Sequence, residues 1–268
     1  MPDLDPAPNP APDPDRKPEP KREIALIQFL PNAMTLGAIA AGVTALRMAF
    51  AGNLDLAMLL ILLAAILDGL DGRIARVLGS ESPIGAELDS LADLVNFGVA
   101  PAFILGVWSL LTVPVLGWGA ALFYVICAAL RLARFNVGIK SGAINDPRFF
   151  TGVPSPAGAL LALSPIILSN AFPALTPPGL VSAIWLVICG ALMISRIPSF
   201  SLKMRVPRAW KKPGLILLVG VFASLVFFPW STLFAFNLVY LGSIPVAVRK
   251  AAQLATEPAP APTTVAGE

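Results

Sequence analysis

The chain has 268 residues, of which 56% are hydrophobic and 13% are charged, with a formal net charge of +3. Soluble domains contain about 25% charged residues, whereas here apolar runs of about 20 residues, long enough to span a bilayer, recur along the sequence. This composition excludes an ordinary soluble domain and predicts an all-α, polytopic transmembrane helix bundle. The positive charge does not indicate nucleic-acid binding, because the basic residues lie in short loops between apolar segments, as membrane topology requires.

The first element in chain order is a proline-rich tail over residues 1–24, which begins "MPDLDPAPNPAPDPDRKPEPKR". Alternating proline with scattered charge cannot bury a core, so we expect this tail to be disordered. The end of the chain, 251–268, has the same character and carries the same expectation. Between the tails we predict a membrane domain over 25–200, followed over 201–250 by a basic cytoplasmic loop and two C-terminal transmembrane helices.

Eight apolar segments lie between the tails. Their approximate bounds are 30–50, 54–78, 86–111, 115–137, 155–172, 179–197, 213–228 and 231–247. A signal peptide is the rival interpretation of the first segment, since basic residues precede it. That segment is long, lacks a convincing small-residue cleavage site and carries Asn32 and Thr35, so we interpret it as a retained helix. Pro229 and Trp230 divide the last two segments.

Lysine and arginine residues fall on alternate connections between these segments. If both termini are cytoplasmic, every basic residue except Arg47 lies on the cytoplasmic side. The opposite connections carry none, near 51–54, 112–115, 173–178 and 229–230. The positive-inside rule therefore predicts a multi-pass protein of the cell inner (cytoplasmic) membrane, with eight spans and both termini inside.

Four aspartates lie where the second segment ends and the third begins, in "LDGLDGRIARVLGSESPIGAELDSLADLV". Asp68 and Asp71 are three residues apart in one predicted helix. Asp89 and Asp93 are four residues apart in the next. Each pair therefore shares one face of its helix, and the turn residues between the helices make the two helices antiparallel neighbours. The four carboxylates can then converge at the cytoplasmic rim of the bundle.

Four nearby negative charges repel one another unless something neutralises them. Hard divalent cations prefer oxygen ligands, and two ions held by four carboxylates would suit a phosphoryl-type displacement. A proton or cation relay in a cation-coupled transporter is the alternative from a different class, because carboxylates at membrane depth usually mark function. Solvated loop carboxylates are the structural alternative. The chain has no histidine, which excludes that residue as base, nucleophile or metal ligand.

Small residues and an arginine accompany the aspartates. Gly72 follows Asp71 inside a helix, where glycine is unfavourable, and this makes sense if a ligand must approach the backbone. Close packing between helices is the alternative explanation for such a glycine. Arg76 lies four residues after Gly72 and could offer a planar fork to a phosphate, or could serve as a topology anchor.

These residues resemble the signature of the CDP-alcohol phosphatidyltransferase family, D-x2-D-G-x2-A-R, eight residues, then G-x3-D-x3-D. Every fixed position is filled, by Asp68, Asp71, Gly72, Ala75, Arg76, Gly85, Asp89 and Asp93. The resemblance extends over most of the first six segments. It implies a six-helix family core, to which the last two segments are added.

The resemblance also implies a reaction and residue roles. Members of the family exchange the CMP of a CDP-linked lipid or alcohol for a hydroxyl acceptor. The four aspartates would bind two divalent ions, Mg²⁺ or Mn²⁺, and Asp93 would be the general base. The CDP-lipid site would be formed by Asn32, Thr35, Gly72, Ala75, Arg76, Ser82 and Gly85. A homodimer is expected because relatives are often dimeric.

Three further stretches, "ELDSLADLVNFGVAPA", "ALRLARFN" and "FTGVPSPAGA", resemble the serine-using members of this family. They imply CDP-diacylglycerol and L-serine as substrates. The acceptor or phosphate pocket would then contain Arg131, Arg134, Asn136, Lys140 and Ser155. Arginines near a helix end could hold a carboxylate or a phosphate, or could be positive-inside anchors. Glycerol 3-phosphate, inositol phosphate and choline stay open as acceptors, because spacing cannot distinguish them from serine.

Overall fold

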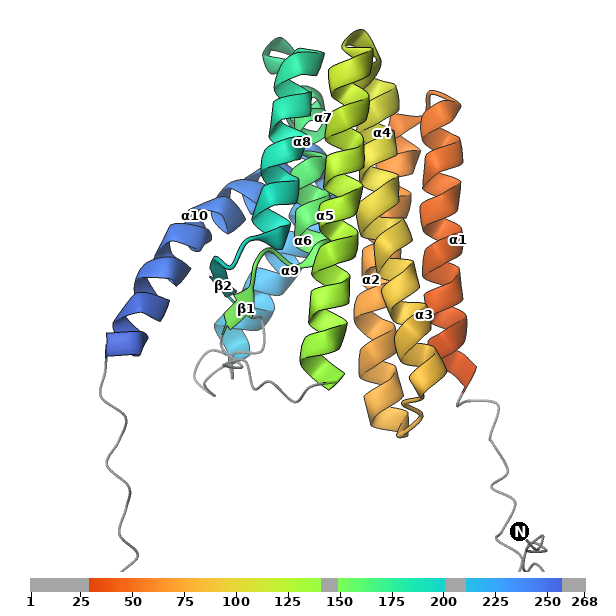
Figure 1. The fold of residues 1–268 in the computed structure, drawn as a ribbon, viewed down its shortest axis with the longest axis vertical. Coiled ribbons are helices and arrows are strands. Elements are labelled where there is room, and N and C mark those ends of the chain that lie inside the picture. The colour runs from red at the N-terminus through yellow and green to blue at the C-terminus, as the bar shows by residue number, and fades with distance from the viewer. Residues whose placement is uncertain (1–28, 141–148, 201–210, 257–268) are drawn as a thin grey trace, which may run out of the picture.

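A computed structural model describes residues 29–140, 149–200 and 211–256 of the chain. In these residues the chain forms a bundle of helices and one small pair of strands (Figure 1). The α-helices are α1 (Leu30–Phe50), α2 (Leu54–Leu78), α3 (Pro83–Asp93), α4 (Ala100–Trp108), α5 (Pro114–Lys140), α6 (Ser155–Ala162), α7 (Ser164–Ala171), α8 (Gly179–Ile194), α9 (Lys211–Phe227) and α10 (Pro229–Thr256). The strands are β1 (Phe149–Thr151) and β2 (Pro198–Phe200), which pair antiparallel.

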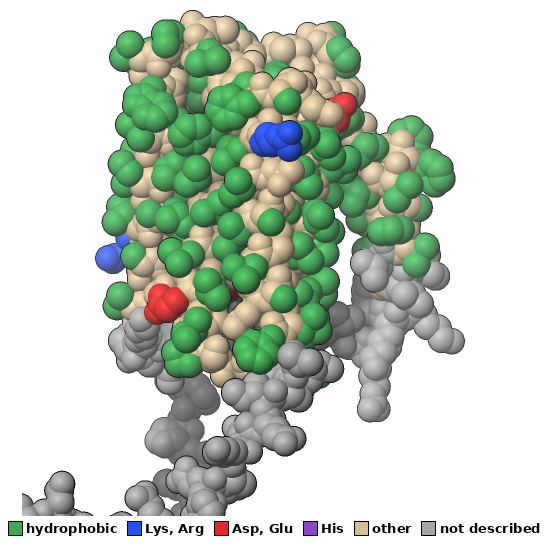
Figure 2. Space-filling model, turned by 90° about the vertical axis from the view of Figure 1, so that its right-hand side faces the viewer, with side chains coloured by type: hydrophobic (Ala, Val, Ile, Leu, Met, Phe, Trp, Pro, Cys, Tyr) green, Lys and Arg blue, Asp and Glu red, His purple; other side chains and the backbone are tan. Residues whose placement is uncertain are grey.

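Four helical stretches of the described chain are long and apolar enough to cross a membrane. They are Leu30–Phe50, Pro83–Trp108, Pro114–Gly138 and Pro229–Lys250. Helix α2 has 25 residues but carries two aspartates and two arginines in its second half. Figure 2 shows a face of the bundle on which hydrophobic side chains are widespread and charged side chains are few, a surface suited to lipid rather than water. The chain is therefore a polytopic helical membrane protein, as predicted.

The predicted segments correspond to helices, but several of their ends differ from the prediction. The segment expected at 155–172 is divided into α6 and α7. Helix α10 continues to Thr256, past the expected end at 247, because Arg249 and Lys250 interrupt the apolar run on which the prediction depended. The predicted tail at 1–24 and residues 257–268 lie outside the described residues.

The division between α6 and α7 has a direct cause in the sequence. Pro165 has no backbone N–H, so the carbonyl of Leu161 has no helical partner four residues later. The indole Nε1–H of Trp185, on α8, donates to that carbonyl at 2.7 Å. One residue earlier, the carbonyl of Leu160 accepts a hydrogen bond from Nδ2 of Asn237, on α10, at 3.1 Å. The proline break thus supplies acceptors that fix two other helices.

A second proline shapes the helix that carries half of the aspartates. Between α3 and α4 the chain forms a π-helical turn, Leu94–Val99. Pro101 follows it and cannot donate to the carbonyl of Phe97, which a regular helix would require. The hydroxyl of Tyr124, fully buried on α5, donates to this carbonyl at 2.8 Å. The interrupted helix is therefore fixed to α5 directly after the predicted catalytic aspartate.

The α2–α3 connection, which joins the two pairs of aspartates, lies at one end of the bundle. The beginning of α1, the α2–α3 connection and the end of α10 all lie at the lower end in Figure 1. Helices α1 and α2 pack closely there and along their length. Buried alanines, including Ala38, Ala41 and Ala64, line their contact and let the backbones approach. The described loops at the other end join α1 to α2, α4 to α5 and α7 to α8.

Candidate active site

Turn and cap residues bring α2 and α3 together in antiparallel orientation. Gly79 ends α2 in the left-handed conformation, with φ +59°, which glycine adopts without steric cost. Ser82 caps α3 by accepting a hydrogen bond from the backbone N–H of Gly85 at 3.0 Å, and Pro83 occupies the first turn. Helix α3 therefore begins at Pro83 rather than at 86. This reversal places the two aspartate pairs at the same end of the bundle.

A cavity of about 540 Å³ lies between the start of α1, the end of α2 and the start of α3. All seven residues predicted for the CDP-lipid site line it: Asn32, Thr35, Gly72, Ala75, Arg76, Ser82 and Gly85. Asp71 and Asp89 line the same cavity. Its volume falls in the range of roughly 300–1,000 Å³ that is usual for small-molecule sites. Residues from three helices thus form one cavity large enough for a nucleotide.

The two glycines of the cavity differ in what surrounds them. A Cβ atom added to Gly72 would meet no atom within 4 Å, so close helix packing does not explain this glycine, and ligand approach is favoured. A Cβ atom added to Gly85 would lie 2.9 Å from Oδ1 of Asn32 and 3.1 Å from the hydroxyl of Ser82. Gly85 therefore lets two polar side chains reach the cavity wall together.

Thr35 acts on an aspartate as well as lining the cavity. Its hydroxyl donates to Oδ2 of Asp71 at 2.6 Å and lies 3.1 Å from the carbonyl of Pro31. The other carboxylate oxygen of Asp71 accepts from the backbone N–H of Gly72 at 2.5 Å. Both Thr35 and Asp71 are buried. Thr35, which we expected to touch the nucleotide, therefore holds the Asp71 carboxylate in a fixed orientation.

The remaining aspartates lie close enough to interact. The carboxyl groups of Asp68 and Asp93 lie within hydrogen-bonding reach of each other, and Asp68 also lies near the charges of Asp71 and Asp89. Carboxylates this close repel one another, and a bound cation would offset that repulsion. Oδ1 of Asp68 is buried and has no hydrogen-bond partner. These oxygen donors fit a hard divalent ion.

The described residues do not, however, include three or more His, Cys, Asp or Glu side chains gathered as a formed metal site. Asp71 is held by Thr35, while Asp68 turns toward Asp93. The predicted two-ion arrangement is therefore supported here by the chemistry of the donors and by one buried carboxylate oxygen, and it stays a proposal.

On the far side of Asp93 lies an arginine from α5. Nη1 of Arg131 donates to the hydroxyl of Ser155, the first residue of α6, and the guanidinium attracts the Asp93 carboxylate. The ring of Phe135 lies one turn further along α5, with its centroid 6.0 Å from the guanidinium carbon. Arg131, on α5, thus connects the predicted base Asp93 with Ser155 at the start of α6.

The other predicted acceptor residues are placed differently. Arg134 is exposed, and its Nη1 donates to the backbone carbonyl of Ile194 at 2.8 Å, so it binds the end of α8. Nδ2 of Asn136 donates to the hydroxyl of Ser90 at 3.0 Å and joins α5 to α3. The side chain of Lys140 lies outside the described part of the chain. The structure brings together Arg131, Ser155 and Asp93, but not Arg134.

Several residues around the site were not predicted. Pro31, Ser80, Glu81 and Ala86 line the cavity in addition to the predicted set. Three of these lie in or beside the turn between the aspartate pairs, where the family signature leaves positions free. These three residues are close in sequence to Ser82 and Gly85, and this was the sequence feature that could have identified them as part of the cavity.

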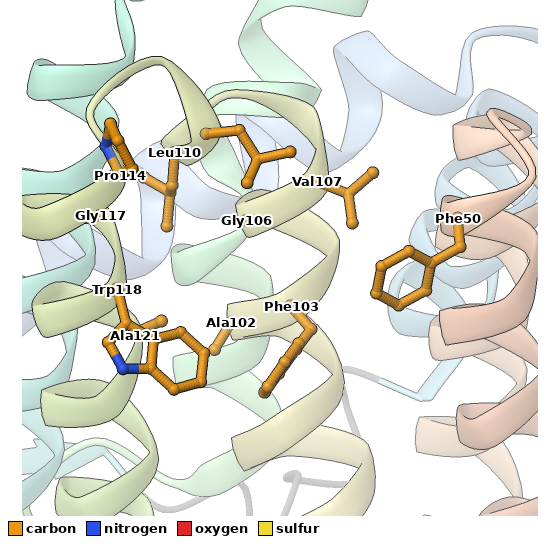
Figure 3. Close-up of a pocket in the computed structure, with 11 residues that line it drawn as sticks. Phe50, Ala102, Phe103, Gly106, Val107, Leu110, Pro114, Gly117, Trp118 and Ala121 are labelled. Atoms are coloured by element: carbon orange, nitrogen blue, oxygen red, sulfur yellow. The ribbon is translucent and has the colours of Figure 1, made fainter.

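A second, smaller cavity of about 220 Å³ lies at the opposite end of the bundle (Figure 3). Phe50, the last residue of α1, and Pro114, the first of α5, both border it. Its other walls come mainly from α4 and α5, where Phe103 and Trp118 pack edge to face with centroids 6.0 Å apart. Its lining contains no acid or base, so it offers no group for the transfer chemistry.

Comparisons with known proteins show which family the chain belongs to. The family described as CDP-alcohol phosphatidyltransferase matches residues 28–197. A Mycobacterium leprae protein named CDP-diacylglycerol–serine O-phosphatidyltransferase is 41% identical over 242 residues, 88% of this chain and 80% of its own length. A Helicobacter pylori protein of the same name is 36% identical over 221 residues, 80% of this chain and 89% of its own. The chain therefore belongs to the CDP-alcohol phosphatidyltransferase family.

Proposed function

We propose that the protein transfers the phosphatidyl group of CDP-diacylglycerol to the hydroxyl of L-serine, giving phosphatidylserine and CMP. The observation that carries the transfer is the single cavity in which all seven predicted CDP-lipid residues meet Asp71 and Asp89. The choice of serine is supported by the name that relatives similar over most of the chain share. A cation-coupled transporter would not require this combination of cavity and family match.

Arg76 is suited to bind a phosphate of the CDP-lipid. Its Nε donates to the backbone carbonyl of Gly72 at 2.9 Å, which directs the guanidinium along the cavity wall. The remaining N–H groups can make charge-assisted hydrogen bonds to phosphate oxygens. Asn32 and Ser82, brought together over Gly85, offer polar contacts to the same ligand.

The four aspartates would hold two divalent ions, Mg²⁺ or Mn²⁺, which when bound would neutralise the charge that develops on the phosphates. Asp71, oriented by Thr35, and Asp89 face the cavity where the diphosphate would lie. Asp93 would take the proton from the serine hydroxyl as attack begins, because a positioned carboxylate makes a poor nucleophile reactive. The leaving CMP would be stabilised from the side of Arg76.

The acceptor pocket would lie beside Asp93, on the side of α5. The guanidinium of Arg131 has five N–H donors, and Ser155 uses one of them. A carboxylate held by the others would bring the hydroxyl of serine close to Asp93, which neighbours Arg131. Asn136 would support this pocket by fixing α5 to α3, whereas Arg134 and Lys140 would act as anchors at the membrane surface.

We also propose that the cavity opens to the cytoplasm and that the protein lies in the inner membrane with both termini inside. The positive-inside pattern supports this orientation, because the connections at the end opposite to the cavity carry no lysine or arginine. Water-soluble serine and CMP would then exchange with the cytoplasm, while the acyl chains stay in the bilayer. A homodimer stays a prediction from the family resemblance.

The purified protein, given CDP-diacylglycerol and Mn²⁺ or Mg²⁺ with one candidate acceptor at a time, tests the proposal through CMP release. We expect release with L-serine and only background release with glycerol 3-phosphate, inositol phosphate or choline. Release with another acceptor in place of serine would contradict the substrate. No release with any acceptor would contradict the enzyme assignment.

A further inference from the structure

Helix α3 carries Asp89 and Asp93, yet apolar packing holds this helix only weakly. Of its 11 residues, Ala92 alone is buried. Two of its large apolar side chains, Ile84 and Leu91, are 72% and 58% exposed. Lipid tails are as apolar as these side chains, so hydrophobic burial gives helices in a membrane little mutual attraction, and hydrogen bonds between them matter more. The position of α3 therefore depends on its polar contacts.

Ser90 makes such a contact with α5. Nδ2 of Asn136 donates to the hydroxyl oxygen of Ser90 at 3.0 Å, and Oδ1 of the same amide lies 3.4 Å from that oxygen. The hydroxyl hydrogen has a nearer acceptor in the carbonyl of Ala86, at 3.1 Å. Both side chains are half-buried. The amide of Asn136 thus faces Ser90 with both of its polar atoms, from a helix turn 46 residues further along the chain.

The place of Ser90 between the two aspartates gives this contact its importance. Ser90 directly follows Asp89 and precedes Asp93 by three residues, so Ser90 and Asp93 share a face of α3. Each residue of a helix adds about 100° of rotation and about 1.5 Å of rise. A small rotation or slide of α3 on α5 would therefore displace both carboxylates at once.

We infer that Ser90 is a positioning residue of the transfer reaction: through Asn136 it fixes the rotation and height of α3 on α5, and so keeps Asp89 and Asp93 directed at the aspartates of α2. This inference rests on the proposed function. A reacting group is effective only if its neighbours hold it within roughly 0.5 Å of the productive position. Asn136, which we predicted for the acceptor pocket, then acts on α3 and not on the acceptor itself.

The inference predicts which constants change when the contact is lost. Ser90→Ala removes the hydroxyl that receives the Asn136 amide. We expect kcat at saturating serine and Mn²⁺ to fall about tenfold, since misplacement by about 1 Å can cost 10²-fold in rate. The affinity for Mn²⁺, measured by loss of the EPR signal of the free ion, should fall about fivefold, the effect of one hydrogen bond. KM for L-serine should change less than about twofold, because Arg131 and Ser155 are not altered.

Two further variants of α3 serve as controls. Ser90→Thr keeps the hydroxyl and should restore kcat and Mn²⁺ affinity to within about twofold of the unmodified protein. Leu91→Ala shortens the next, exposed side chain and leaves the Ser90 hydroxyl in place, so its constants should not change. The inference is wrong if Ser90→Ala leaves kcat and Mn²⁺ affinity within twofold, or if either control lowers them equally. A fall in kcat with a rise in both KM values would indicate a generally loosened fold and would also contradict it.

A double-mutant cycle tests the part of Asn136. Asn136→Ala alone should lower kcat about tenfold and leave KM for L-serine within about twofold. Because both changes remove the same contact, the double variant with Ser90→Ala should also lose about tenfold in kcat, whereas independent effects would multiply to about a hundredfold. A hundredfold loss, or a raised KM for serine with Asn136→Ala, would contradict the inference.

Asp93→Asn separates the failure of this inference from the failure of the proposed function. If Asp93→Asn strongly lowers CMP release while Ser90→Ala changes neither kcat nor Mn²⁺ affinity, only the role of Ser90 is wrong. If the unmodified protein binds Mn²⁺ but releases no CMP with any acceptor, the proposed function is wrong, and the inference falls with it.

Discussion

The two sides of the site are held in place by different means. The CDP-lipid side is built from α1, α2 and α3, which follow one another in the chain, and its residues are positioned by helix spacing, a glycine turn and a serine cap. The acceptor side is built from the end of α3, from α5 and from the start of α6, which are separate in sequence. Its residues are positioned by hydrogen bonds between helices, such as those of Ser155 and Asn136.

This difference indicates how each side can vary. A site encoded in one short stretch changes only if the signature changes, so the nucleotide end stays common to a family. A site assembled from distant helices changes whenever a contact between helices is replaced, so the acceptor end can be altered without disturbing the nucleotide end. The acceptor should accordingly be the more adjustable part of the reaction.

The largest expected effect tests the residue where the two sides meet. Asp93→Asn keeps the shape of the side chain but removes the general base, and such a base contributes roughly 10²–10⁴ in rate. We expect turnover to fall by about that factor, while binding of CDP-diacylglycerol, measured by equilibrium binding to the protein in nanodiscs, is largely kept. Asp55→Asn, an exposed aspartate at the other end of α2, should leave both unchanged. Rates like those of the unmodified protein for Asp93→Asn would refute the assignment of the base.

The next effect tests whether the CDP-lipid side is a ligand cavity. Gly72→Ala adds a methyl group that meets no protein atom but points into the space proposed for the ligand. Overpacking of this kind costs roughly 1–3 kcal/mol, so KM for CDP-diacylglycerol should rise about tenfold or more. The measurement is CMP release as a function of CDP-diacylglycerol in mixed micelles.

Gly69→Ala is the matched control for this experiment. Gly69 also lies on α2 with no atom near its added Cβ, but it does not line the cavity. Both substitutions improve helix propensity by up to about 1 kcal/mol, so their effects on stability should be alike. An equal KM for the two variants would show that the cavity is not where the CDP-lipid binds.

An effect of similar size tests whether Thr35 orients Asp71 or contacts the nucleotide. Thr35→Val removes the hydroxyl that donates to Asp71, and hydrogen bonds to charged groups contribute roughly 1.5–3 kcal/mol. We expect the affinity for Mn²⁺ to fall about tenfold or more, measured both by activity and by loss of the EPR signal of free Mn²⁺. Thr35→Ser keeps the hydroxyl and should retain most of the affinity. If Thr35→Val weakens CDP-diacylglycerol binding without changing Mn²⁺ affinity, the hydroxyl serves the nucleotide.

The sequence predicts the residues of the CDP-lipid side better than the contacts between helices, because the former lie in one short stretch of the chain. The cavity residues could be predicted because the spacing from Asp68 to Asp93 fixes helix faces and the fixed positions of the signature name the residue types. The role of Thr35 could not, because its partner Asp71 is 36 residues away and their contact depends on how α1 packs on α2. The positions of Lys and Arg along the chain predict an orientation in the membrane, but they do not indicate that Arg131 rather than Arg134 would lie near Asp93.

Beyond the cavity, the sequence predicts where helices are interrupted, but not which side chains satisfy the backbone carbonyls that the interruptions leave free. Pro165 and Pro101 each predict a break in a helix, since proline removes a backbone donor. No local pattern shows that Trp185, Asn237 or Tyr124 will supply the missing hydrogen bonds. The strands β1 and β2 also escaped prediction, because three residues each are too few to show an alternating pattern.

The smallest expected effect compares two hydrogen bonds made to the same break. Asn237→Ala removes the bonds that fix α10, and Trp185→Phe removes the bond that fixes α8, both at the junction of α6 and α7. Each loss should cost about 1 kcal/mol of stability, the usual size for a hydrogen bond between membrane helices, and lower the thermal unfolding midpoint similarly.

Helix α10 also contacts β2, whose partner β1 precedes Ser155. Only Asn237→Ala should therefore also raise KM for serine, by about two- to fivefold, since a loosened α10 samples other positions. Neither variant should alter KM for CDP-diacylglycerol, because α1, α2 and α3 do not depend on this junction. A rise in KM for serine with Trp185→Phe as large as that with Asn237→Ala would mean that the break itself, and not the helix docked on it, shapes the acceptor pocket.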